Sequence, residues 1–415
     1  MKALESPLRR RWFILAIIFA AIVLNYVDRQ ILSILKPTLK AEFGFDDRGY
    51  AILVNVFTVG YALMYPVAGW LVDRFGARMV MLSGIVTWSL ACLGAGLTRG
   101  FASFAVFRGV LGLSEPTAFP SQLRAVTLWF PGSLRATANS VCVAGGTFGA
   151  IIAPPLVAWL AISFNWHSAF LFPGTLGLLV ALLWYFIYRD PPPEILVHSA
   201  ATRGGALESE GFRWLGLWRT RSLWAILLIR FISDPVWYFC LFWLPGYLQE
   251  QSGLTLAQVG MVGWIPFLAA DLGGIASAAW SDWMVRKGRA PLQARKRMLT
   301  AMACLAPLCA LTPHFPHPAA TLLIFSLVAA ACLSWLFSLS VVIAEAFPTA
   351  NVASVLGIAG GFGAAGAVVF NSFVGEMMST IGPTRVFAAM AVLHPIATVV
   401  LWIMVRPERP RPIFS

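Results

Sequence analysis

Charged residues are scarce in this sequence: they make up 12% of its 415 residues, whereas hydrophobic residues make up 59%. A water-soluble domain needs more charged side chains than this to cover its apolar surface, so the composition excludes an ordinary soluble protein. Lipid, by contrast, can cover such a surface. The sequence therefore predicts an all-α membrane protein.

Cysteine and histidine are also sparse, with six and five residues. All six cysteines fall in apolar stretches and lack the spacing of metal ligands, which favours a role as small apolar filler. The histidines form no array of the HExxH kind. We therefore expect no metal, no cofactor and no catalytic residues, and the protein is not expected to be an enzyme.

A nucleotide-binding signature, GxGxxG, is matched by Gly361, Gly363 and Gly366. The match lies inside an apolar stretch, with no preceding strand and no βαβ context, so nucleotide binding is disfavoured. Small residues in an apolar helix allow two helices to approach closely or one helix to bend. The sequence predicts helix packing at these glycines.

Twelve apolar stretches are long enough, at about 20 residues each, to cross a bilayer as helices. A polar segment with three consecutive prolines separates two sets of six, which is typical of a transporter whose ligand site lies between two bundles. The predicted domains are an N-terminal bundle over 1–188, a cytoplasmic linker over 189–222 and a C-terminal bundle over 223–415. The predicted spans are 12–34, 50–72, 79–98, 101–124, 136–160, 168–188, 223–249, 257–284, 298–314, 319–346, 352–379 and 384–405.

The net charge of +12 raises the alternative of a nucleic-acid partner. The basic residues, however, are concentrated in every second loop between the predicted spans. Arginines precede the first span and recur in the loops that would share its side, whereas the opposite loops hold few. This is the positive-inside pattern, so we expect a multi-pass protein of the cell (inner) membrane with both termini cytoplasmic. We expect lipid and no nucleic acid around it, and a monomer. The opposite loops carry Lys36, Lys40, Arg48, Arg99 and Arg385.

The segment after the second span resembles the loop signature of the major facilitator superfamily. A weaker form of the pattern, including Asp282 and Arg286, follows the eighth span. The acid and its arginines are expected to lock the cytoplasmic helix ends in one state and to release them in another. The alternative is that the loop only satisfies helix ends and orients the chain. The residues that match are Gly69, Asp73, Arg74, Gly76 and Arg78.

The first predicted span holds Asp28 and Arg29, and the fourth holds Arg108 and Glu115. A charge at mid-bilayer costs about 2.5–3.5 kcal/mol on insertion scales, so each should have a purpose. Arg108 and Glu115 are seven residues apart and share a helix face. We expect all four side chains to meet in one cavity.

The four residues have two alternative uses. A guanidinium can hold a substrate carboxylate in a bidentate pair, and a buried acid can load and unload a proton. Alternatively, the charges form two ion pairs that merely join the two helices. Small residues could join them at lower cost, which favours the first use.

Asn25–Arg29 together with Phe107–Gly109 and Glu115 resembles the anion:cation symporter family of that superfamily. The resemblance implies that Asp28 and Glu115 couple protons, that Arg29 binds the substrate carboxylate and that Arg108 tunes the acids. The stretches 234–245 and 266–273 are most similar to hexuronate carriers. Gly145-Gly146 departs from some sugar-acid relatives, which present polar side chains there.

Aromatic rings suit a sugar because they pack on its CH faces while their polar groups reach its hydroxyls. With Arg29 and Arg108, the candidate substrate-binding residues are Tyr26, Tyr61, Trp237, Tyr238, Trp243 and Asn371. We expect proton-coupled symport of a hexuronate such as galacturonate or glucuronate. The alternatives are another organic monoanion, such as an aldonate or an aromatic acid, and, less favoured, anion exchange.

Overall fold

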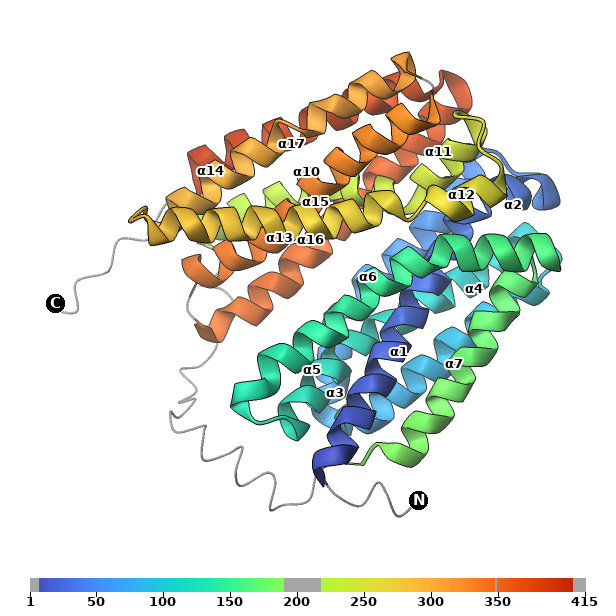
Figure 1. Ribbon diagram of the computed structural model, residues 1–415, viewed down its shortest axis with the longest axis horizontal. Helices are drawn as coiled ribbons and strands as arrows, with labels where there is room; N and C mark the ends of the chain where they lie inside the picture. Colours follow the sequence, from blue (N-terminus) through green and yellow to red (C-terminus); the bar gives the residue numbers. More distant parts are fainter. Residues whose placement is uncertain (1–6, 190–217, 316, 348, 406–415) are drawn as a thin grey trace. The chain divides into compact units, whose positions relative to one another are not determined.

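The computed structural model describes residues 7–189, 218–315, 317–347 and 349–405, and these are helical apart from short connections (Figure 1). Most of the predicted linker, residues 190–217, lies outside the described residues, as do the arginines after residue 405. The predicted domain boundaries therefore stay predictions.

The described helices divide into two compact units. The first holds α1 to α7 together with the segment Phe242–Trp264, which carries α11 and α12. In this unit α1 packs against α6 and α7, and α3 packs against α4 and α7. Its helices are α1 Pro7–Ile34, α2 Lys36–Phe43, α3 Asp47–Leu97, α4 Phe101–Ser114, α5 Ala118–Trp129, α6 Gly132–Ser163, α7 Ser168–Ile187, α11 Leu244–Glu250 and α12 Leu256–Val262.

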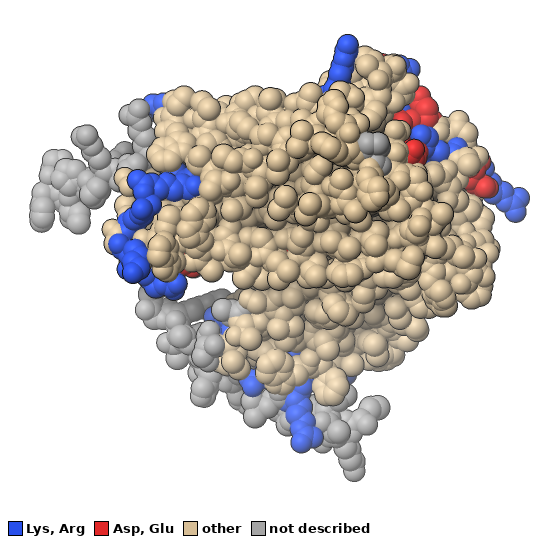
Figure 2. Space-filling model, turned by 45° about the horizontal axis from the view of Figure 1, so that its top comes forward, with Lys and Arg blue, Asp and Glu red and all other residues tan. Residues whose placement is uncertain are grey.

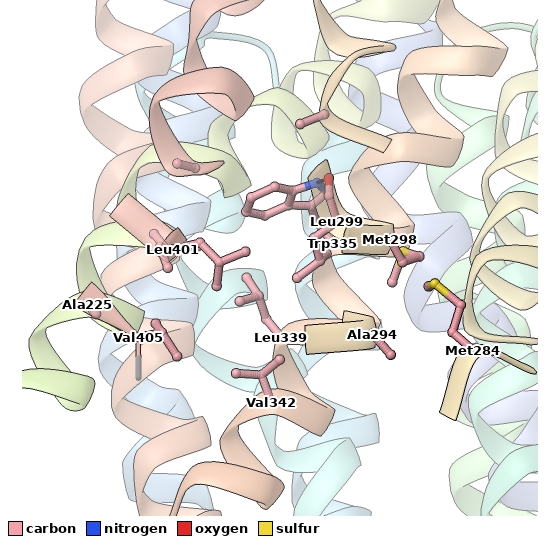
Figure 3. Close-up of a cluster of buried hydrophobic side chains, with 13 residues drawn as sticks. Ala225, Met284, Ala294, Met298, Leu299, Trp335, Leu339, Val342, Leu401 and Val405 are labelled. Carbon is pink, nitrogen blue, oxygen red and sulfur yellow. Dashed lines mark hydrogen bonds between the residues drawn. The ribbon is translucent and has the colours of Figure 1, made fainter. Parts of the chain in front are cut away.

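The second unit has its own apolar core. Trp335 of α15 lies fully buried among side chains of α14 and α17, and its indole N–H donates to the backbone oxygen of Leu299 at 3.0 Å (Figure 3). This hydrogen bond satisfies the polar atom that the ring takes into the core. The helices of this unit are α10 Arg221–Phe242, α13 Ile265–Arg286, α14 Pro291–Ala303, the 3₁₀ helix Ala306–His314, α15 Pro318–Ala346, α16 Thr349–Thr380 and α17 Pro383–Met404.

A single glycine separates the second and third predicted spans. α3 runs over 51 residues, but Gly76 has φ 79° and ψ 158° and interrupts it. A side chain at this φ would be strained, so glycine suits the break. The expected loop is therefore reduced to one residue, because residues 69–75 continue the preceding helix.

Long apolar helices dominate the described part of the chain, where nine are long and apolar enough to cross a membrane. One of these is α3, which contains two predicted spans. The fourth predicted span is built from α4, a 3₁₀ turn and α5, and the ninth from the end of α14 and a 3₁₀ helix. The elements are consistent with twelve spans. Uncharged atoms cover most of the face seen in Figure 2, as expected for a surface against lipid.

Two of the three GxGxxG glycines, Gly363 and Gly366, serve helix packing as predicted, whereas Gly361 has open space beside it. A Cβ at Gly366 of α16 would lie 2.1 Å from the backbone oxygen of Phe231, and one at Gly363 would lie 2.0 Å from a carboxylate oxygen of Asp234. Both contacts are with α10, so α16 and α10 approach too closely for any side chain at these positions.

Replacing Gly366 with alanine is expected to destabilise the protein by about 1–3 kcal/mol, because the backbone of Phe231 cannot move aside cheaply. Gly361→Ala is the matched control, since a Cβ there meets nothing within 4 Å. Thermal unfolding of the purified proteins measures the effect. Equal midpoints for the two variants would contradict this account of the packing.

A cluster of four charges holds α11 against α2 and the start of α3. The ammonium of Lys36 lies 2.7 Å from Asp47 and 2.6 Å from Glu250, and that of Lys40 lies 3.1 and 3.0 Å from the same two acids. Lys36 is buried, and its ammonium also lies over the rings of Tyr50 and Trp243, at 5.2 and 4.9 Å from their centroids. The charges balance, and each acid accepts from both lysines.

Replacing Glu250 with glutamine is expected to lower the free energy of unfolding by about 1–2 kcal/mol, because Lys36 stays buried with one carboxylate fewer.

The same cluster makes stability depend on pH through Lys40. Burial lowers the pKa of Lys40, but hydrogen bonds and charge attraction to Glu250 and Asp47 raise it overall. The contribution of Lys40 is therefore complete at neutral pH and is lost as pH rises through that raised pKa. Unfolding midpoints at neutral and strongly alkaline pH check this. Glu42→Gln, at an exposed acid of α2, is the control. Equal unfolding midpoints for Glu250→Gln and Glu42→Gln would contradict the prediction.

Candidate functional site: a buried charge cluster in the first unit

The fourth predicted span breaks at Glu115. α4 ends at Ser114, a 3₁₀ turn follows over Glu115–Thr117, and α5 begins at Ala118. Pro116 has no N–H to continue the α-helical ladder, which explains the break. The Ser114 and Thr117 hydroxyls donate to backbone oxygens within this stretch, at 2.8 and 2.7 Å. The break places a carboxylate in the middle of an apolar span, facing α1.

Arg29 and Glu115 form a buried ion pair. The Nε and Nη2 atoms of Arg29 donate to Oε2 of Glu115 at 3.1 and 2.6 Å. Arg29 is 8% exposed and Glu115 is 0% exposed, so the pair is shielded from solvent. Nη2 of Arg29 also donates to Oδ1 of Asn25, one helical turn earlier, at 3.2 Å. The predicted meeting of the first and fourth spans is therefore observed at these two residues.

Asp28 is buried beside this pair but has a different partner. The thiol of Cys92, on α3, donates to Oδ1 of Asp28 at 3.4 Å, and the other carboxylate oxygen has no hydrogen-bond partner within the described residues. The expectation that the cysteines are only apolar filler is thus wrong for Cys92. Its neighbour in space could not be read from the sequence, because the two residues are 64 positions apart.

Arg108 is the second buried guanidinium. It is 1% exposed, and none of its three side-chain nitrogens has a hydrogen-bond partner in the part of the chain described. Its guanidinium carbon lies 4.6 Å from the centre of the Phe57 ring. The same ring lies 5.4 Å from the guanidinium carbon of Arg29. One aromatic side chain, absent from the sequence predictions, therefore contacts both arginines.

Two tyrosines complete the surroundings of Arg29. The rings of Tyr26 and Tyr61 lie 5.0 and 4.9 Å from its guanidinium carbon. A Cβ at Gly146 of α6 would lie 2.8 Å from the Tyr26 ring. The departure noted at Gly145-Gly146 therefore has a local reason: a polar side chain at position 146 would collide with Tyr26.

Several polar atoms of the cluster have unused hydrogen-bonding capacity. Within the described residues, Nδ2 of Asn25 and Oε1 of Glu115 lack partners, in addition to one oxygen of Asp28 and the three side-chain nitrogens of Arg108. Buried polar groups are normally satisfied, and groups left without partners call for an explanation. Donors and acceptors side by side, with two guanidinium groups, can bind a molecule that carries a carboxylate and hydroxyl groups.

The structure does not join the remaining predicted substrate residues to Arg29 by any contact described above. Trp243 is buried against Tyr50 and Lys36. Trp237, Tyr238 and Asn371 belong to the second unit, where the Trp237 ring packs edge-on against Phe267 at 6.4 Å and Asn371 is buried in α16. That these three share a site with Arg29 stays a prediction. In the second unit, Arg230 and Asp234 of α10, one helical turn apart, form an ion pair at 3.2 Å.

The first signature segment contacts neighbouring helices at several points. Asp73 pairs with Arg124 of α5 at 3.3 Å, rather than with the arginines of its own motif. Arg78 donates to the backbone oxygen of Tyr185 at 3.1 Å, and Arg74 lies over the ring of Trp70 at 5.6 Å. Gly69 has open space beside it. An exposed ion pair therefore joins Asp73 to α5, and the role of this segment in gating stays a prediction.

The second signature segment repeats this arrangement. Asp282 of α13 pairs with Arg295 of α14 at 2.6 Å, and Arg295 also donates to the hydroxyl of Ser281 at 2.8 Å. Arg286 lies in the last turn of α13. In each unit the signature acid therefore pairs with an arginine of another helix. The sequence offered no signal for these partners, because basic residues are abundant near both positions.

Fold and site together define a multi-pass membrane transporter. Within the described residues, no group of three histidine, cysteine or acidic side chains could hold a metal ion. The sequence profile of the Major Facilitator Superfamily matches residues 18–294. The chain belongs to this superfamily, whose members are transporters rather than enzymes, and the predicted family and fold are confirmed.

Three known proteins show what the chain is similar to. The "Hexuronate transporter" of Escherichia coli (strain K12) is 26% identical over 405 residues, covering 94% of this chain and 93% of the relative. The "Galacturonate transporter" of Dickeya chrysanthemi is 30% identical over 275 residues, covering 64% and 79%. The crystal structure of a D-xylose-proton symporter has a TM-score of 0.77 at 15% identity, covers 97% and 99% of the two chains, and shows the shared fold.

Proposed function

We propose that this protein carries a sugar acid across the membrane, together with protons, by alternating access. The proposed substrate is a hexuronate such as galacturonate or glucuronate. The buried pair of Arg29 and Glu115, beside a second guanidinium, is the observation that carries the proposal. The names of the two curated relatives support the choice of substrate.

The proposed mechanism is a competition for Arg29. In the structure Glu115 occupies the guanidinium, and a substrate carboxylate would need the same N–H groups. Protonation of Glu115 removes its charge and weakens this pair, which leaves Arg29 for the substrate. Loss of the proton restores the pair and releases the substrate. The two events are coupled because one guanidinium serves both acids.

Charge balance supports coupling of this kind. Two guanidinium groups and two carboxylates sum to zero when all are ionised, and one proton entering with one monoanion leaves the sum at zero. A second proton would add a positive charge, and its movement would draw on the membrane potential at ~2.3 kcal/mol per charge per 100 mV. Asp28, whose second oxygen has no described partner, is the proposed site of that proton.

The proposed setting is the inner membrane with both termini cytoplasmic, as the distribution of basic residues indicates. We also propose that the protein is monomeric. The pairs Asp73–Arg124 and Asp282–Arg295 are proposed to lock helix ends in one state of the cycle.

Uptake into proteoliposomes tests the proposal. Galacturonate, glucuronate, galactonate and an aromatic acid are each supplied with and without an inward proton gradient. We expect hexuronates to accumulate only with the gradient. Preferred accumulation of galactonate or of the aromatic acid would reassign the substrate. Uptake that ignores the gradient but needs an internal anion would instead identify an exchanger.

A further inference from the structure

Phe57 is the residue that the two buried arginines share. Its ring is 2% exposed and lies within cation–π distance of both guanidinium groups, 5.4 Å from Arg29 and 4.6 Å from Arg108. Arg29 also has Glu115, Asn25 and two tyrosine rings. For Arg108, whose nitrogens lack hydrogen-bond partners in the described chain, the Phe57 ring is a direct cation–π contact, beside the attraction of Glu115.

The backbone around Phe57 is fixed by close helix packing. A Cβ at Gly112 of α4 would lie 2.2 Å from the backbone oxygen of Phe57, so the two helices touch backbone to backbone at this point. One turn further along α3, a Cβ at Gly60 would lie 3.1 Å from the oxygen of Gly109. Glycines on both helices therefore set the depth at which the ring enters the cluster.

Neighbouring rings fix the orientation of the Phe57 ring. Tyr61 and Phe242 each lie 5.9 Å from it, the second edge-on. Packed interiors leave a side chain little freedom to adopt another rotamer. The face of this ring, which carries partial negative charge, is therefore available to both guanidinium groups without occupying any of their N–H donors.

We propose that Phe57 is a positioning residue for substrate binding: it holds Arg29 and Arg108 in place through its π face and leaves their N–H groups free for the anion. A carboxylate in place of Phe57 would also attract both arginines, but it would compete with the substrate for the donors. The ring stabilises two like charges next to each other without such competition. This inference rests on the proposed function, since the anion is the substrate of that function.

Graded fluorination of the ring tests the proposal without changing the shape of the side chain. Phenylalanine at position 57 is replaced by its mono-, di- and trifluorinated analogues, which progressively weaken the negative face. We expect the dissociation constant for galacturonate, measured by titration calorimetry, to rise stepwise to about five- to tenfold with the trifluoro ring. Phe57→Leu should weaken binding at least as much.

Phe104 is the matched control. It is fully buried in the same unit and packs against the rings of Phe43 and Phe170, and within the described residues it forms no cation–π contact with an arginine. Fluorination at position 104 should leave the affinity unchanged. An unchanged affinity with the trifluoro ring at position 57, or an equal loss at 57 and 104, would overturn the role of Phe57. Failure of the wild-type protein to bind any sugar acid would overturn the proposed function, and the inference with it.

Discussion

Replacing Glu115 with glutamine is expected to abolish accumulation of the sugar acid driven by a proton gradient. Glutamine keeps the size of the side chain and can still accept a hydrogen bond from Arg29, but it cannot bind and release a proton. Arg29 then faces a neutral partner in every state of the cycle. Binding of the substrate should be unchanged or tighter, because an ionised carboxylate no longer competes for the guanidinium.

Two assays on the same preparation separate these effects. Proteoliposomes loaded with unlabelled substrate measure exchange, which needs no net proton movement, and empty proteoliposomes with a pH gradient measure accumulation. The variant should exchange and should not accumulate. Glu42→Gln, at an exposed acid of α2, removes the same charge away from the cluster and should accumulate like wild type. Accumulation by Glu115→Gln at the wild-type level would remove Glu115 from proton coupling.

The architecture and the burial of four charged residues were predictable because the bilayer imposes strong constraints. A spanning helix needs a long apolar run, and a charge within such a run is costly unless it is paired or used. Asp28, Arg29, Arg108 and Glu115 stand out for this reason alone. Their burial agrees with the expectation, whereas the ion pair Arg29–Glu115 is a contact of the alternative in which the charges join the two helices.

The identity of the other partners was not predictable, because it depends on how helices pack. Phe57 is one of 30 phenylalanines in an apolar chain, and nothing in its sequence context distinguishes it. Cys92 was interpreted as filler, although its thiol donates to Asp28. Trp243 was predicted to bind substrate, and nothing in the sequence indicates its contacts with Lys36 and Tyr50. In each case the deciding contact joins distant positions, and single-sequence patterns carry no such information.

Replacing Arg29 with alanine is expected to weaken sugar-acid binding by about a hundredfold or more, because the guanidinium supplies the charge-assisted pair to the carboxylate. The single variant has a second effect: Glu115 stays buried without its cation, which destabilises the protein by itself. Arg29→Ala combined with Glu115→Gln removes that orphaned charge. If the loss of affinity persists in the double variant, it reflects the missing anchor rather than a disturbed fold.

Two further variants, Arg108→Ala and Arg29→Lys, determine which arginine binds the substrate carboxylate. Lysine keeps the charge of Arg29 but not the planar fork of donors, so it should restore only a small part of the affinity. Arg108 has its donors free in the described structure, whereas those of Arg29 are occupied by Glu115 until a proton arrives. If Arg29 is the anchor, affinity in the wild type therefore rises as pH falls, and it loses this dependence in Glu115→Gln. If affinity is instead kept in Arg29→Ala and lost in Arg108→Ala, Arg108 holds the carboxylate, and Glu115 affects binding only through the charge it places beside both arginines.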